Sequence, residues 1–278
     1  MKHQRKQGKK MIGEVQKHII DTLGAQPSID PNYEIRRRID FIKKMVTGSL
    51  RKGVVLGISG GQDSTLAGKL SQLAVDELNA EGYEAKFVAV RLPYGEQRDG
   101  KDADDAIAYI QPTEARVVNI KEPVDALVGS HYAPVKDYHK GNVKARMRMI
   151  AQYLIAGEED LLVCGTDHNS EAITGFFTKH GDGAADILPL SGLNKRQGKA
   201  LLRVLNAPER LYLKAPTADL LDGVQGQPDE TELGLTYDEI DDYLEGKEIP
   251  EEKAYRLERM YFSTEHKRHT PIGLADVL

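Results

Sequence analysis

The chain has 278 residues, of which 40% are hydrophobic and 29% charged, and its formal net charge at pH 7 is −5. These values are typical of a globular protein with a sizeable core, and the acidic balance argues against a dedicated nucleic-acid binder, which would usually be basic. The single cysteine, Cys164, excludes an internal disulfide and a cysteine-rich metal site, and it suits a reducing compartment.

Neither a membrane span nor a secretory signal is expected. No apolar run approaches the ~20 residues that cross a bilayer. The basic start at residues 1–10 is not followed by an apolar core. We therefore expect a cytoplasmic protein without a membrane or nucleic-acid partner.

The hydrophobic pattern alternates along the chain between helical spacing and short β-branched runs. Helices are expected at 12–24, 32–46, 64–79, 102–110, 123–132, 141–156, 195–205, 237–244 and 251–264. Strands are expected at 53–58, 85–92, 115–120 and 160–165, with a short fifth one at 211–213. This succession predicts an α/β fold: a doubly wound, Rossmann-like parallel sheet of about five strands flanked by helices, with helical extensions at both termini.

Three polar segments interrupt this pattern. Residues 93–100 follow an expected strand, at the sheet edge where ligands of open α/β sheets bind. Residues 176–189 mix charged residues with glycines between apolar ends, which indicates an ordered functional loop. Residues 216–232 are rich in Gly, Pro and Asp, as a lid would be.

The stretch V-V-L-G-I-S-G-G-Q-D-S-T reads as a strand, a glycine turn and a helix. Ser59, Gly60 and Gly61 end the apolar run and leave no side-chain bulk between the backbone and a ligand. A helix that begins after such a turn presents unpaired N–H groups to an anion such as phosphate. The dipole contributes only ~0.3–1 kcal/mol, so tight pyrophosphate binding also needs the hydroxyl of Ser64 and a metal held by Asp63.

This turn is not a Walker loop, because no Lys follows the glycines, and it lacks the full G-x-G-x-x-G of a dinucleotide fold. The residues from Gly57 to Ser64 resemble the S-G-G-x-D-S pyrophosphate loop of the N-type ATP pyrophosphatase superfamily. Members of that superfamily cleave ATP between the α and β phosphates, adenylate an oxygen of their substrate and release pyrophosphate. An ordinary tight strand–helix turn is the alternative.

A second carboxylate occupies an equivalent position later in the chain. Glu171 comes just after the expected strand 160–165, as Asp63 comes just after its own strand. The two carboxylates could therefore share one Mg²⁺ against the phosphates of ATP. Taken alone, Glu171 would be an ordinary surface residue of a helix.

Motifs spread over residues 35–268 resemble those of the ammonia-dependent NAD synthetases. They are S-G-G-Q-D-S-T, R-L-P-Y-G, K-A-R, G-T-D-H-N-S-E, F-F-T-K-H-G-D-G-A-A-D-I-L-P-L, K-A-P-T-A-D-L and H-K-R. The resemblance implies a fold of the adenine nucleotide alpha-hydrolase type. It also implies the last step of NAD biosynthesis: amidation of deamido-NAD by ammonia through an NAD-adenylate, with ATP going to AMP and pyrophosphate.

The resemblance implies one domain over residues 1–278, with an N-terminal extension at 1–32, a catalytic core at 33–269 and a tail at 270–278. The tail is small and weakly apolar, so contacts made through it are left open. The resemblance further implies a homodimer in which the dinucleotide lies partly across the subunit interface.

The resemblance also implies a role for individual residues. The ATP-binding positions would be Gly57, Ile58, Ser59, Gly60, Gly61, Gln62, Asp63, Ser64, Arg91, Thr166, Lys195 and Thr217. Deamido-NAD would contact Arg146, Lys179, Asp186, His266 and Lys267, and Mg²⁺ would bind Asp63 and Glu171. A solvated basic helix face is the plainer interpretation of Arg146 and its neighbours Lys144 and Arg148.

The expected chemistry follows from charge. A carboxylate is a poor electrophile, so it must first attack the α-phosphorus of ATP, and this brings two anions together. Mg²⁺, Asp63 as its ligand, Lys195 and the backbone amides of the loop would offset that repulsion. Because most ammonia is protonated at neutral pH, we hypothesise that Asp186 binds ammonium and helps to remove its proton.

Three other functions compete with this interpretation. A tRNA-modifying enzyme of the same superfamily should have a basic surface or paired cysteines, and a GMP synthetase-like enzyme needs a further dimerisation domain and a glutaminase. A nucleotide sensor of the universal stress type would explain the nucleotide fold but not Glu171, Lys179 and Asp186. Nothing in the chain supplies a glutaminase, since the lone Cys164 lies inside an expected strand. Free ammonia is therefore the expected nitrogen donor.

Overall fold

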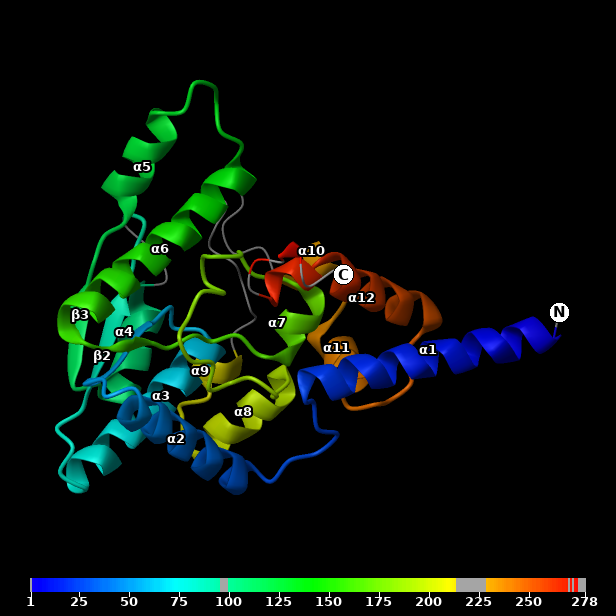
Figure 1. Ribbon diagram of the computed structural model, residues 1–278, viewed down its shortest axis with the longest axis horizontal. Coiled ribbons are helices and arrows are strands. Elements are labelled where there is room, and N and C mark those ends of the chain that lie inside the picture. Colours follow the sequence, from blue (N-terminus) through cyan, green and yellow to red (C-terminus); the bar gives the residue numbers. More distant parts are fainter. Residues whose placement is uncertain (1, 96–99, 214–228, 270, 272, 275–278) are drawn as a thin grey trace.

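The computed structural model describes residues 2–95, 100–213, 229–269, 271, 273 and 274. The strands form one parallel sheet in the order β3-β2-β1-β4. Its strands β2 and β3 are labelled at the left of Figure 1. Its strands are β1 Gly53–Gly57, β2 Lys86–Arg91, β3 Glu114–Val117 and β4 Leu162–Val163. This architecture confirms the predicted α/β fold with a doubly wound parallel sheet.

The chain order of the strands reverses beside β1. The chain runs outward from β1 through β2 to β3, and then returns to place β4 on the other side of β1. In open α/β sheets, the crevice at such a reversal, outside the carboxyl ends of the strands, is where ligands bind. The segments that follow β1 and β4 therefore meet at this point.

The described residues form four strands rather than about five. The strand expected at 211–213 is wrong, because these residues belong to helix α9, Arg210–Leu213. Leu211 and Tyr212 are both buried although they are adjacent, and the amide of Leu213 bonds to the carbonyl of Glu209, as in a helix. The sheet instead continues past β4 by one isolated parallel bridge between Cys164 and Ile187.

Helices cover both faces of the sheet and form the two terminal extensions. Their bounds are α1 Lys2–Leu23, α2 Pro31–Gly48, α3 Gln62–Ala80, α4 Gly100–Ile110, α5 Lys121–Gly129, α6 Asp137–Glu159, α7 Asn169–Thr174, α8 Lys195–Val204, α10 Asp229–Leu233, α11 Tyr237–Leu244 and α12 Glu251–Ser263, followed by a 3₁₀ turn at Glu265–Lys267. None of the helices in the described part of the chain is long and apolar enough to cross a bilayer.

The alternation of side chains along the strands separates two cores. Val54 and Leu56 of β1 pack with α2, α3 and α8, whereas Val55 between them packs on the opposite face with α5 and α6. Both faces are therefore buried, as the continuous apolar run predicts. A third apolar cluster joins α1, α7, α11 and α12, and it includes Ile19 and Ile173. The N-terminal half of α1 extends away from the rest of the protein (Figure 1).

Candidate functional site

The glycine turn after β1 has the geometry of an anion site. Gly60 has φ +84, and a Cβ there would lie 2.5 Å from the backbone carbon of Asp102, so only glycine fits without strain. Gly61 is the N-cap of α3 and supplies no side-chain bond to the first helical N–H groups. Those groups are therefore open to an anionic ligand.

Two hydroxyls of the turn form a hydrogen bond with each other. The Oγ atoms of Ser59 and Ser64 lie 3.0 Å apart, and the amide of Gly61 donates to Ser59 Oγ. At the entry to the turn, the amide of Gly57 donates to Gln152 Oε1 of α6 at 2.7 Å. Sequence reasoning missed Gln152, because its link to the turn spans 95 residues of chain.

A buried ion pair joins the first turns of α3 and α8. Lys195 Nζ lies 2.7 Å from Asp63 Oδ2, and Lys195 is 8% exposed. Burial favours the neutral form of Asp63, but Lys195 and, after it, His168 together outweigh it and hold the pKa of that carboxyl well below its ordinary value. Burial would also lower the pKa of Lys195, and the charges of Asp63 and Glu171 raise it instead. Both groups are therefore charged at neutral pH.

A second buried carboxylate, Asp241 of α11, holds the start of α8. Its Oδ1 accepts hydrogen bonds from Ser170 Oγ at 2.9 Å and from the Lys195 amide at 3.2 Å, and its Oδ2 accepts from the Arg196 amide at 2.7 Å. Because Ser170 precedes Glu171 directly in α7, Asp241 links the helix that carries Lys195 to the helix that carries Glu171. No local sequence signal distinguished Asp241 from the other acidic residues of its helix.

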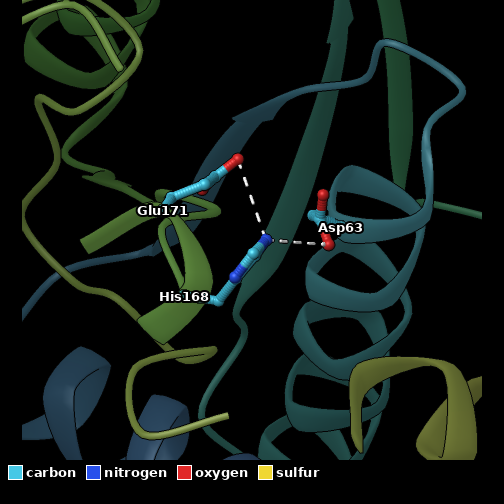
Figure 2. A group of neighbouring side chains, drawn as sticks. All are labelled: Asp63, His168 and Glu171. Carbon is cyan, nitrogen blue, oxygen red and sulfur yellow. Dashed lines mark ion pairs between the residues drawn. The ribbon is translucent and has the colours of Figure 1, made fainter. Parts of the chain in front are cut away.

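The segment after β4 brings Glu171 to the same place. His168 is the N-cap of α7, and its Nε2 lies 3.6 Å from Asp63 Oδ1 and 3.8 Å from Glu171 Oε1 (Figure 2). One atom from each of Asp63, His168 and Glu171 lies within 4.8 Å of the others. The predicted pair of carboxylates therefore converges, and His168, which stands inside the G-T-D-H-N-S-E motif, joins it.

Several carboxyl groups lie close together around Asp63 and Glu171. Burial, and then the charges of Asp63 and Asp167, raises the pKa of Glu171 well above its ordinary value. Burial, together with Asp182 and Asp63, raises the pKa of Asp167 to about 7. A divalent cation would relieve this repulsion, and carboxylate oxygens are the ligands that Mg²⁺ prefers. The residues present therefore fit a hard cation at Asp63 and Glu171.

Four of the five residues expected to contact the dinucleotide lie in one group. The guanidinium of Arg146 donates to the carbonyl of Lys179 at 3.2 and 3.3 Å, and Lys179 Nζ donates to the carbonyl of His266 at 2.6 Å. Lys267 Nζ, next along the chain, donates to the carbonyls of Gly175 and Phe177, each at 2.8 Å. We call Arg146, Lys179, His266 and Lys267 the basic group.

Asp186 lies apart from these contacts, at the edge of the sheet. Its Oδ2 accepts a hydrogen bond from the Val163 amide at 2.8 Å, and its Oδ1 accepts one from Tyr153 of α6 at 3.4 Å. Within the described part of the chain, these hydrogen bonds tie Asp186 to β4 and α6. They do not tie it to Asp63, Lys195 or Glu171.

The remaining predicted ATP contacts are placed as follows. Arg91, at the end of β2, pairs with Asp104 of α4 at 2.6 Å. Thr166 follows β4 in the segment that leads to His168. Thr217 lies outside the described residues, as do most of the expected lid at 216–232 and residues 96–99 of the loop at 93–100.

Comparison with known proteins finds one family over nearly the whole chain. A sequence model of the NAD synthase family matches residues 34–271. An NH(3)-dependent NAD(+) synthetase of Bacillus velezensis is 56% identical over 266 residues, which are 94% of this chain and 98% of that protein. The corresponding protein of Bacillus pumilus is 57% identical over 267 residues, with the same shares of the two chains.

Solved structures are similar over the same range. The crystal structure of an NAD+ synthetase from Burkholderia pseudomallei superposes with a TM-score of 0.81 at 44% identity, and it covers 94% of this chain and 98% of its own. An NMN synthetase from Francisella tularensis superposes with a TM-score of 0.78 at 32% identity, and it covers 88% of this chain and 99% of its own.

Proposed function

The chain belongs to the NAD synthase family, and from this premise we propose that the cluster around Asp63 binds the phosphates of ATP while the basic group binds the dinucleotide. The reaction is the ATP-dependent amidation of deamido-NAD with ammonia, which yields NAD, AMP and pyrophosphate. One observation carries the assignment of the ATP end. Asp63 after β1 and Glu171 after β4 meet at the reversal of the sheet, beside Lys195 and the open N-terminus of α3.

At the ATP end, fixed positive groups would offset the repulsion between the substrate carboxylate and the triphosphate. Lys195 is already charged and held in place by Asp63 and Asp241, so its placement for the reaction costs little reorganisation. The open N–H groups of the first turn of α3 add donors toward the phosphates. A Mg²⁺ held by Asp63 and Glu171 would, when bound, neutralise part of the phosphate charge.

At the dinucleotide end, the cations of the basic group are held by backbone carbonyls rather than by carboxylates. Their charges are therefore not neutralised by these partners and remain available to the phosphates of deamido-NAD. Arg146 and His266 are exposed, while Lys179 and Lys267 are partly exposed. The group can thus be reached by a substrate from solvent.

Two carboxylates compete for the proton of ammonium. Asp186 is the one expected from the sequence, and its partly open position supports binding of a small cation, although Val163 and Tyr153 already bond to it. Asp167 has a pKa of about 7, which suits a general base near neutral pH. Comparing Asp186→Asn with Asp167→Asn at limiting ammonium separates the two. If Asp186→Asn retains full activity there, its role is wrong.

We propose a homodimer that uses the exposed apolar side of α6. Ile150 and Leu154 are 51% and 64% exposed although both are large and apolar, and Tyr153 between them is 36% exposed. An apolar patch of this kind is typical of a protein interface. Leu154→Glu should convert the protein to a monomer in sedimentation experiments, and Leu50→Glu, an equally apolar exposed position in the turn after α2, should not.

We also propose a cytoplasmic location and one catalytic domain at 33–269. The free, buried Cys164 supports a reducing compartment. The family match at 34–271 supports the domain bounds.

The proposal is tested with purified protein, ATP, Mg²⁺ and a nicotinate substrate, by scoring the amidated product, AMP and pyrophosphate. We expect stoichiometric NAD, AMP and pyrophosphate from deamido-NAD with ammonium, and little NAD with glutamine. Replacing deamido-NAD by nicotinate mononucleotide tests the activity named for the Francisella protein. Faster turnover of the mononucleotide would contradict the substrate proposed here.

A further inference from the structure

His168 is buried at the centre of the acidic cluster with one ring nitrogen unpaired. The residue is 3% exposed, and its Nε2 atom has no hydrogen-bond partner in the described structure. Figure 2 shows this nitrogen pointing between the carboxylates of Asp63 and Glu171. A buried polar atom without a partner is costly in a folded protein and calls for an explanation.

An Asp, a His and a Glu that converge are also what many transition-metal sites use. The other ring nitrogen argues against this role for His168. Nδ1 accepts a hydrogen bond from the Ser170 amide at 3.2 Å, because His168 caps the start of α7. A nitrogen that accepts from an N–H carries no hydrogen, so the ring hydrogen lies on Nε2. An Nε2 that carries a hydrogen has no lone pair for a metal.

The same hydrogen can instead be donated to a carboxylate. Asp63 Oδ1 and Glu171 Oε1 lie 3.6 and 3.8 Å from Nε2, a few tenths of an ångström beyond a hydrogen bond. The other oxygen of Asp63 is already paired with Lys195. A small movement of either carboxylate toward a shared cation would complete the bond to Nε2.

We propose that His168 is a positioning residue: its Nε2–H orients the carboxylates of Asp63 and Glu171 for a hard divalent cation, and His168 does not itself ligate the metal. The inference rests on the proposed cation site and adds that this site offers oxygen ligands alone. Outer donors of this kind typically contribute 10- to 100-fold to metal affinity. Such a site favours Mg²⁺ or Mn²⁺ over metals that prefer imidazole.

Two substitutions separate the two ring nitrogens. In His168→Asn, the side-chain oxygen can replace Nδ1 as the cap of α7, but nothing replaces Nε2–H. In His168→Gln, the longer amide can place an N–H near the position of Nε2, but the cap is lost. If His168 only capped α7, Mn²⁺ affinity would fall more in His168→Gln than in His168→Asn.

The experiment measures Mn²⁺ binding by electron paramagnetic resonance in the presence of α,β-methylene-ATP, whose α–β bridge is not cleaved. We expect His168→Asn to weaken Mn²⁺ binding by about 10-fold with little change in Tm. His168→Gln should stay within about 3-fold in affinity and lower the Tm by about 2–4 °C. The matched control is His18→Asn, at an exposed position of α1, and it should change neither value.

Electron spin echo of the bound Mn²⁺ reports directly on nitrogen ligands. We expect the wild type and His168→Asn to give the same nitrogen signal. A directly bound nitrogen that disappears in His168→Asn would overturn the inference and leave the cation site standing. Unchanged Mn²⁺ affinity in His168→Asn would overturn it too. If the wild type binds no more Mn²⁺ than Asp63→Asn does, the proposed cation site fails and the inference fails with it.

Discussion

The two ends of the site differ in how their charges are held. At the proposed ATP end, Asp63 and Lys195 are paired side chain to side chain at 2.7 Å in a largely buried position. At the proposed dinucleotide end, Arg146 and Lys179 lie at or near the surface and donate to backbone carbonyls. One end is thus paired internally and the other is open to solvent.

The difference follows from the cost of burial. A buried charge without a partner costs several kcal/mol, so groups at the ATP end must neutralise one another even before a ligand binds. Exposed charges are solvated and gain only about 0–1 kcal/mol from a partner, so the basic group needs no such arrangement. We therefore expect substitutions at the ATP end to change catalysis and folding together, and those at the dinucleotide end to change substrate affinity.

The largest effect is expected for Lys195→Met. It removes the positive charge that we propose stabilises the transition state, and it leaves the largely buried Asp63 without its cation. We expect kcat for NAD formation to fall about 10²- to 10³-fold. Lys199→Met, one turn further along α8, serves as the control. A change of less than about 5-fold in kcat for Lys195→Met would contradict the expected difference between the two ends of the site.

Asp241→Ala should come next, because it removes the acceptor for Ser170 Oγ and for the amides of Lys195 and Arg196. We expect a loss of about 2–4 kcal/mol in the free energy of unfolding in urea. A fall in kcat of about 10-fold should accompany it, because Lys195 is displaced. Asp238→Ala on the same helix removes only an exposed pair with Arg196 and should cost less than about 1 kcal/mol.

Lys179→Met tests the other end. It removes a partly exposed cation without leaving a buried charge unpaired, so KM for deamido-NAD should rise about 5- to 10-fold while kcat and Tm stay nearly constant. Steady-state kinetics at saturating ATP measure the split. A loss of kcat with an unchanged KM would place Lys179 at the reacting end instead.

Salt should produce the smallest effect and should also separate the two ends. At physiological salt the screening length is about 8–10 Å, so interactions between exposed charges farther apart than this are largely screened. Buried pairs are screened much less. Raising NaCl to about 0.5 M should increase KM for deamido-NAD about 2- to 3-fold. The difference in Tm between the wild type and Lys195→Met should stay the same. If NaCl raised KM equally in the wild type and in Lys179→Met, the salt effect would not arise from Lys179.

Most of the fold could be predicted from the sequence, because it depends on local pattern. The β-branched run at β1, the glycine turn and the helical spacing of α3 indicate their own conformations, and the alternation of strands and helices then predicts a parallel sheet. The error at α9 has a local cause as well. Three apolar-rich residues suit a strand or a helical turn equally, and only their packing on the core selected the helix.

The sequence by itself determined the glycine turn, the candidate carboxylates Asp63 and Glu171, and the family to which the chain belongs, because these depend on residues close together or on motif identity. The tertiary structure alone decided that Lys195 neutralises Asp63, that Asp241 holds α8, and that the unpaired nitrogen of His168 lies between two carboxylates. It also placed Asp186 beside β4 and α6. These relations join residues far apart in the chain, and the strength of a charge interaction depends on distance and burial, which only the folded protein sets.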